Sequence, residues 1–346
     1  MLLRETIIRK TIKIFYLTFL SSFLSLVFAQ THVLSEEMNI RLSQILNKKT
    51  LTLLITDSGL GGMSVCAGLE KELEENKSFE EVKLIFFNAL PEKGIGYNSM
   101  ATIEMKAEVF NQALISMEKK YTPDLILVAC NTLSVVYPYT NFAKESKTPV
   151  LGIVEFGVEL MLAELKKHNN SDVLILGTET TINSNTHKNK LIENKINSNQ
   201  IIAQAFPGLE SEIQDAPESE TVKAMIELYL IEAVEKLNKT SEPIIAALCC
   251  THYGFCSDIF SSTLQNLSDR EIVLLNPNEM MINTIVKKEI HNRFPKTRVS
   301  VSVISRAIID ESEKQSIGGL VKSFAPLSAL ALMNYVYDPQ LFDYGG

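Results

Sequence analysis

Residues 125–132 read LILVACNT, an apolar run that ends in a cysteine and two short polar side chains. The same order returns at residues 244–252, which read IIAALCCTH. Short apolar runs with β-branched residues are typical of strands that are buried on both faces of a parallel sheet. Each stretch therefore predicts a buried strand with a thiol at its carboxyl end.

Further apolar runs of the same length and character lie along the chain, at residues 51–56, 82–87, 150–154, 173–176, 201–205 and 272–275. Amphipathic stretches lie between them, at residues 102–121, 156–169 and 221–239. This alternation of strands and helices is typical of an α/β protein. We interpret the polar residues 183–200 and the acidic run 210–220 as solvated surface rather than as sites.

The spacing of the strand ends indicates an internal repeat. Asp57 ends a predicted strand 73 residues before Cys130, and Gly177 ends another 73 residues before Cys250. Both pairs are 120 residues apart, which predicts two similar α/β lobes. Because ligands of open α/β sheets bind beyond the carboxyl ends of strands, facing lobes would place Cys130 and Cys250 on opposite walls of one cleft.

Two thiols on opposite walls suit the inversion of a carbon atom that carries an acidic C–H bond. One thiolate removes the proton from one face, and the other thiol returns a proton to the opposite face. A free thiol has a pKa of about 8.5, so we expect Asp57 to assist one thiol and His252 the other. Short donors at strand ends and helix starts are expected to hold a carboxylate together with backbone N–H groups: Ser58, Asn131, Thr132, Thr178 and Thr251.

The composition is that of an ordinary globular protein, since 46% of the 346 residues are hydrophobic and 21% are charged. This length allows two domains of about 100–200 residues each. A net charge of −8 and a pI near 5.4 argue against nucleic acid as a partner. The five cysteines have spacings that build no small disulfide scaffold, so thiol chemistry or simple burial is expected.

The N-terminus has the pattern of a secretory signal. Residues 1–13 carry four basic residues and one acidic residue, and residues 14–29 form an uncharged apolar run that precedes Gln30. That run is short for a bilayer span of about 20 residues. We expect residues 1–29 to be a signal peptide, with an N-terminal anchor as the alternative, and residues 30–49 to be a leader or linker. Cleavage predicts an exported protein, periplasmic or secreted, without stable membrane contact. If residues 1–29 are not a signal, the expected location is the cytoplasm.

Four motifs, in order and spacing, resemble those of the aspartate/glutamate racemase superfamily, and most closely those of glutamate racemases. They are Asp57-Ser58-Gly59-Leu60-Gly61-Gly62, Ala129-Cys130-Asn131-Thr132, Gly177-Thr178-Glu179-Thr180-Thr181 and Cys250-Thr251-His252-Tyr253. The resemblance spans about residues 50–275. It implies an amino-acid racemase that needs no cofactor, with two pseudo-symmetric, doubly wound α/β domains around the active site, and frequently a homodimer.

The resemblance also implies a division of the chain and a set of roles. Residues 50–150 and 275–346 would form one domain, and residues 151–274 the other. Cys130 and Cys250 would be the catalytic acid/base pair. The positions that would assist the thiols or contact the amino-acid substrate are Asp57, Ser58, Tyr97, Asn131, Thr132, Thr251 and His252, and Asn98 lies in a loop expected near the substrate carboxylate.

The chain also departs from the glutamate type of this superfamily. Tyr97-Asn98 stands where Tyr-Gly is usual, Cys249 where glycine precedes the second catalytic cysteine, and Tyr253-Gly254 where Tyr-Pro is usual. The family's second-domain tyrosine is replaced by His187, and its Cys-Pro segment by Phe206-Pro207, followed by Glu210, Glu212 and Gln214. Export is a further departure, because an enzyme that supplies D-glutamate for cell-wall peptidoglycan is expected in the cytoplasm.

Simpler or different explanations therefore stay open. The protein could be a racemase for aspartate or other amino acids, another isomerase or a decarboxylase of the superfamily, or an exported two-lobed binding protein without catalysis. A zinc site at residues 249–256 is not expected, because neighbouring strand residues point to opposite faces of a sheet. The glycines at 59–62 match neither a dinucleotide fingerprint nor a P-loop.

Overall fold

The computed structural model describes residues 34–287 and 290–344. The predicted signal peptide or anchor at residues 1–29 lies outside these residues. Within the described ranges, no helix combines the length and apolar character that a membrane crossing needs.

The first lobe is built on a six-stranded parallel sheet with the strand order β10-β9-β2-β1-β3-β4. The register places β1 between β2 and β3, with Ile55 opposite Phe86 on one side and Leu127 on the other. Two strands from the C-terminal part of the chain extend the sheet beyond β2. The strands are β1 (Thr50–Asp57), β2 (Glu81–Asn88), β3 (Leu125–Val128), β4 (Val150–Gly152), β9 (Arg298–Ser305) and β10 (Val336–Tyr337).

The second lobe is built on a four-stranded parallel sheet with the order β6-β5-β7-β8. This order repeats the β2-β1-β3-β4 portion of the first sheet, as the 120-residue spacing predicts. The predicted α/β fold with two similar lobes is therefore confirmed. The strands are β5 (Asp172–Gly177), β6 (Ile201–Ala205), β7 (Ile244–Cys249) and β8 (Ile272–Leu275).

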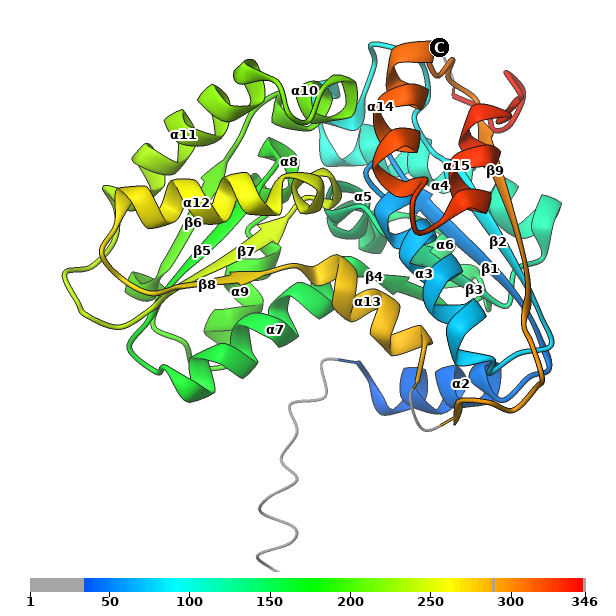
Figure 1. Cartoon of the computed structure of the whole chain (residues 1–346), viewed down its shortest axis with the longest axis horizontal. Helices are drawn as coiled ribbons and strands as arrows, with labels where there is room; N and C mark the ends of the chain where they lie inside the picture. Colours follow the sequence, from blue (N-terminus) through cyan, green and yellow to red (C-terminus); the bar gives the residue numbers. More distant parts are fainter. Residues whose placement is uncertain (1–33, 288–289, 345–346) are drawn as a thin grey trace, which may run out of the picture.

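Helices cover both faces of the sheets (Figure 1). In the second lobe, Val173 and Ile175 pack on the side of α7 and α9, whereas Leu174 and Leu176 pack on the side of α11 and α12. Because successive strand side chains point to opposite faces, a continuous apolar run is what such a two-sided core requires. The helices are α2 (Glu36–Leu46), α3 (Met63–Asn76), α4 (Ile103–Tyr121), α5 (Asn131–Val136), α6 (Phe142–Glu145), α7 (Ile153–Lys167), α8 (Glu179–Asn183), α9 (Thr186–Glu193), α10 (Leu209–Asp215), α11 (Glu220–Val234), α12 (Ser257–Leu267), α13 (Pro277–Ile285), α14 (Glu311–Val321) and α15 (Pro326–Met333), with short 3-10 turns η1 (Tyr97–Ser99), η2 (Tyr137–Tyr139), η3 (Ser198–Gln200) and η4 (Thr251–Cys256).

One hydrophobic cluster connects the two lobes. It runs from Ile126 of the first sheet through Val154 and Met161 of α7 to Val173 and Ile245 of the second sheet. Helix α7 follows β4 directly and packs against β7, so it belongs to the core of both lobes. The residues predicted to be a leader also contribute, since α2 buries Leu42, Ile45 and Leu46 in the core of the first lobe.

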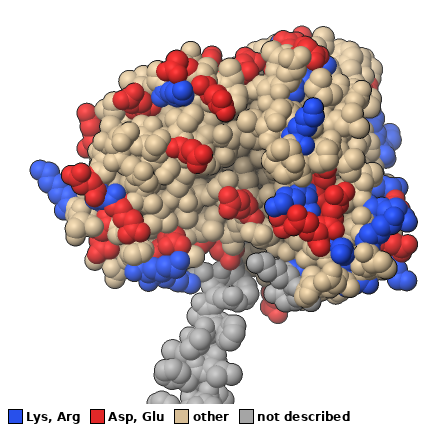
Figure 2. Space-filling view, in the orientation of Figure 1, with Lys and Arg blue, Asp and Glu red and all other residues tan. Residues whose placement is uncertain are grey.

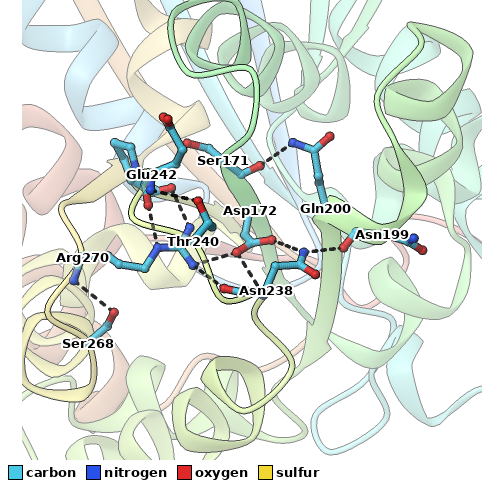
Figure 3. A network of polar contacts seen from close by, with 10 residues as sticks. Ser171, Asp172, Asn199, Gln200, Asn238, Thr240, Glu242, Ser268 and Arg270 are labelled. Atoms are coloured by element: carbon cyan, nitrogen blue, oxygen red, sulfur yellow. Dashed lines mark hydrogen bonds and ion pairs between the residues drawn. The ribbon is translucent and has the colours of Figure 1, made fainter.

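A buried ion pair holds the amino-terminal end of the second sheet together (Figure 3). Asp172 begins β5 and is 0% exposed, and its carboxylate accepts hydrogen bonds from Arg270 Nη1 at 2.7 Å and Asn238 Nδ2 at 2.6 Å. Arg270 also donates from Nε to the carbonyl of Glu242 at 2.6 Å. These contacts fix the loops before β7 and β8 at the end of the sheet that lies away from the thiols.

Candidate active site

A cavity of about 460 Å³ lies between the lobes at the carboxyl ends of the strands. The register places Gly177 opposite Cys249, and Thr56 opposite Val128, so these strands end side by side in each lobe. The residues that follow their ends reach the cavity, among them Cys130 after β3 and Cys250 after β7. All eleven residues predicted for the site line it: Asp57, Ser58, Tyr97, Asn98, Cys130, Asn131, Thr132, Thr178, Cys250, Thr251 and His252. The structure thus brings them together, and their individual roles remain predictions.

Cys130 is contributed by the first lobe. It caps the N-terminus of α5, where its Sγ accepts from the Leu133 N–H at 3.4 Å, and Sγ lies 3.2 Å from Ser58 Oγ. Burial and, after it, the charge of Asp57 raise the pKa of the Cys130 thiol to about 12, while the contacts with Ser58 and Leu133 oppose the rise. The cavity wall around Cys130 therefore favours the protonated thiol.

Asp57 connects the lobes beside Cys130. Its carboxylate is 1% exposed and accepts from the Gly59 N–H at 3.1 Å and from Thr251 Oγ1 of the second lobe at 2.8 Å. The loop after Asp57 needs glycine at position 61, because a Cβ atom there would lie 2.5 Å from His252 Nδ1 and 2.8 Å from the His252 backbone nitrogen. This glycine run thus serves the close approach of the second lobe.

Cys250 and His252 form the matching pair in the second lobe. His252 Nδ1 lies 3.9 Å from Cys250 Sγ, and both side chains are buried. Burial raises the pKa of Cys250 well above its ordinary value, and the nearby charge of Glu210 raises it further. Burial also lowers the pKa of His252, although Asp57 and Glu210 act in the opposite direction. Neutral imidazole beside a protonated thiol is the resting state that these surroundings favour.

Neutral donors line the cavity between the two thiols. Thr132 Oγ1 and Thr178 Oγ1 lie 2.8 Å apart across the interface of the lobes. Asn131 is 2% exposed, and among the described residues neither its amide oxygen nor its amide nitrogen has a hydrogen-bond partner. A buried amide without a partner is costly, so Asn131 is well suited to bind a polar group of a ligand. Tyr97 differs, because its hydroxyl donates to the carbonyl of Ala89 at 3.1 Å.

Sequence reasoning missed one wall of the cavity. The interpretation of residues 210–220 as solvated surface is wrong for α10, because Glu210, Gln214 and Asp215 line the cavity. Glu210 Oε1 accepts from Asn98 Nδ2 at 2.7 Å across the cleft. Positions 210 and 214 are four residues apart, so they share one face of a helix. This spacing could have indicated a functional face, but the acidic composition of the segment favoured the interpretation as solvated surface. Glu313 of α14 also lines the cavity.

The chain is similar in sequence to curated glutamate racemases, whereas no family model matches it. It is 27% identical over 241 residues to the glutamate racemase of a Nitratiruptor species, covering 68% of this chain and 83% of the relative. It is 29% identical over 201 residues to a glutamate racemase of Helicobacter pylori, covering 58% of this chain and 71% of the relative. The predicted resemblance to this group is confirmed.

Solved structures share the fold. Glutamate racemase from Campylobacter jejuni matches with a TM-score of 0.57 and 21% identity, covering 80% of this chain and 99% of that one. Glutamate racemase isoform RacE1 from Bacillus anthracis matches with a TM-score of 0.59 and 17% identity, covering 84% and 97%. A Francisella tularensis glutamate racemase, solved in complex with D-glutamate, matches with a TM-score of 0.56 and 18% identity, covering 80% and 94%.

Proposed function

We propose that this chain, whose relatives are glutamate racemases, is a cofactor-independent amino-acid racemase that interconverts L- and D-glutamate with two thiols. The observation that carries the proposal is the pairing of the thiols: each lobe supplies one buried cysteine to the same cavity. Each cysteine has its own polar neighbour, Ser58 for Cys130 and His252 for Cys250. Such a pair meets the need of racemisation for an acid and a base on opposite faces of one carbon atom.

The proposed reaction balances within the site. One cysteine, as a thiolate, takes the α-proton, and the electron pair of the broken C–H bond moves into the substrate carboxylate. The other thiol gives its proton to the opposite face of the carbon atom, and the two cysteines have then exchanged protonation states. Hydrogen bonds from Asn131, Thr132 and Thr178 would stabilise the negative charge that gathers on the carboxylate.

Proton NMR of residues 30–346, kept reduced in heavy water, tests the proposal with L- and then D-glutamate. We expect the α-proton signal to disappear while the optical rotation decays, and Cys130→Ser and Cys250→Ser to abolish turnover. Cys256→Ser is the matched control, because Cys256 is also buried but does not line the cavity.

The same assay separates the alternative functions. If the α-proton of aspartate or another amino acid exchanges, but that of glutamate does not, the protein is a racemase with a different substrate. Binding without exchange that survives both serine substitutions would contradict catalysis and favour the two-lobed binding protein.

We also propose that residues 1–29 direct the protein out of the cytoplasm, on the basis of their charged and then apolar sequence. Fractionation of the native host followed by mass spectrometry tests this proposal. We expect a mature chain that begins at Gln30 in the exported fraction. An intact Met1 found only in the cytoplasm would contradict it.

Size-exclusion chromatography with light scattering on the same material tests the proposed homodimer.

A further inference from the structure

Gln214 lies between His252 and the first lobe. It sits near the end of α10 in the second lobe, and its side chain makes three hydrogen bonds. Its Oε1 lies 2.7 Å from the backbone nitrogen of Leu60 and 3.1 Å from His252 Nε2. Its Nε2 lies 2.7 Å from Glu313 Oε1.

Two of these partners determine which way the amide of Gln214 faces. The Leu60 N–H can only donate, so it requires an acceptor, which is Oε1. The Glu313 carboxylate is an acceptor, so it requires the amide N–H₂ group. Glu313 is itself held in place, because its other carboxylate oxygen accepts from the Asp310 backbone N–H at 2.7 Å within the capping box of α14.

The orientation of Gln214 determines the tautomer of His252. Because Gln214 presents an oxygen to His252 Nε2, that nitrogen must carry the proton. In neutral imidazole the other nitrogen, Nδ1, then has a free electron pair. Nδ1 is the atom that lies 3.9 Å from Cys250 Sγ. The free electron pair of the histidine therefore faces the thiol.

We propose that Gln214 is a positioning residue that fixes His252 in the tautomer able to take the proton of Cys250. This inference rests on the proposed racemase function. In the step it supports, the Cys250 S–H bond breaks, the thiolate keeps the electron pair, and the proton forms a new bond to His252 Nδ1. The reverse transfer restores the thiol, so the relay consumes nothing.

The partners of Gln214 also make this relay depend on contact between the lobes. Leu60 and Glu313 belong to the first lobe, whereas Gln214 and His252 belong to the second. The approach is close, because a Cβ atom at Gly59 would lie 2.9 Å from Gln214 Oε1. The tautomer of His252, the base next to Cys250, is thus fixed when the first lobe docks on α10.

Nitrogen NMR of the histidine-labelled protein tests the tautomer without any need for turnover. The chain has five histidines, so His252→Gln assigns the signal. We expect a protonated Nε2 and an unprotonated Nδ1 in the wild type, and a mixture of tautomers in Gln214→Leu. A protonated Nδ1 in the wild type would overturn the inference. This result does not depend on whether the protein is a racemase, so the two proposals can fail separately.

Kinetics test the consequence for catalysis. We expect Gln214→Leu to lower kcat by about 100-fold, within the usual contribution of a positioned acid or base. The primary isotope effect with α-deuterated glutamate should rise in one direction only, the one in which Cys250 removes the proton. Two results would contradict this role. If the isotope effects are equal in both directions and kcat is unchanged, Gln214 does not act on Cys250. If the isotope effects are equal and kcat falls only as far as a lower Tm explains, Gln214 is merely structural.

The exchange variant Gln214→Glu/Glu313→Gln supplies a conservative rescue. It keeps the three hydrogen bonds but moves the carboxylate next to His252, which favours imidazolium. We expect it to recover activity lost in Gln214→Glu and to shift the acid limb of the kcat/KM profile to higher pH. Glu311→Gln is the control, because Glu311 lies on the same helix as Glu313 but pairs with Lys314 and does not line the cavity. Failure of the exchange variant to recover activity would contradict the relay.

Discussion

Cys130 and Cys250 carry the proposed chemistry from buried positions, where a thiolate loses its hydration. Burial and the charge of Asp57 raise the pKa of Cys130 to about 12, so the thiolate is rare at neutral pH. We therefore expect kcat/KM to rise about tenfold per pH unit between pH 7 and 9, as the thiolate fraction grows. A pH series of initial rates measures this, with Cys256→Ser as control. A flat profile would show that the thiol loses its proton when substrate binds, rather than as the pH of the solution rises.

Glu210 is the carboxylate that acts most strongly on Cys250. Burial is the largest cause of the raised pKa of the Cys250 thiol, and the negative charge of Glu210 is the next largest. Glu210→Gln removes the charge and keeps the shape, so we expect it to lower the pKa of Cys250. The measurement is the pH dependence of Cys250 alkylation, followed by mass spectrometry. Glu212→Gln is the matched control, because Glu212 lies on the same helix but is exposed. An unchanged alkylation profile would argue against this assignment.

His187 is a buried histidine outside the proposed chemistry. Burial lowers its pKa from 6.5 to about 4, and among the described residues neither ring nitrogen has a hydrogen-bond partner. The unfolded chain therefore binds the proton first as the pH falls, and stability is lost from about pH 6.5 downward. Linkage gives a loss of roughly 2 kcal/mol between pH 7 and 5 from this group.

His187→Leu should remove that part of the acid sensitivity. Urea unfolding of the wild type and of His187→Leu at pH 7 and pH 5 measures it. An equal loss of stability in wild type and His187→Leu would contradict the prediction.

The elements that could be predicted from the sequence are those with a local signal. Strands β1, β3, β5 and β7 appear as apolar runs, and their polar ends identify the thiols and the donors around them. Helix α10 contains no apolar run of this kind. Only the resemblance drew attention to Glu210 and Gln214, which become site residues when the first lobe docks on them. The contact of Gln214 with Glu313 joins positions 99 residues apart, and local pattern contains no information about such a contact.

The loops at the amino ends of the second sheet depend on one buried ion pair. Arg270→Leu would leave the Asp172 carboxylate buried without its charged partner, which typically costs about 3–5 kcal/mol. Urea unfolding should show this loss, and Asp172→Asn in the same chain should recover part of it, since an amide oxygen still accepts from Asn238. Arg298→Leu is the control, because its pair with Glu81 is largely exposed and we expect a cost of about 0–1 kcal/mol.

At the scale of the whole molecule, the repeat of two lobes follows from the spacing of the cysteines, but the way the lobes join does not. The C-terminal strands β9 and β10 complete the first sheet from residues far along the chain. On the face drawn in Figure 2, acidic and basic side chains are interspersed rather than gathered into a basic area.

The shared core makes the two lobes one folding unit. Helix α7 places Val154 and Met161 in the cluster that also holds Ile126 of the first sheet and Ile245 of the second, so neither lobe can unfold without exposing apolar surface of the other. We expect calorimetry to show a single transition whose calorimetric and van't Hoff enthalpies agree. Arg270→Leu should then lower the temperature of the whole transition, although the lost ion pair lies in the second lobe alone. Two resolved transitions, with only one shifted by the substitution, would show instead that the lobes fold independently and that the cavity between them forms by docking.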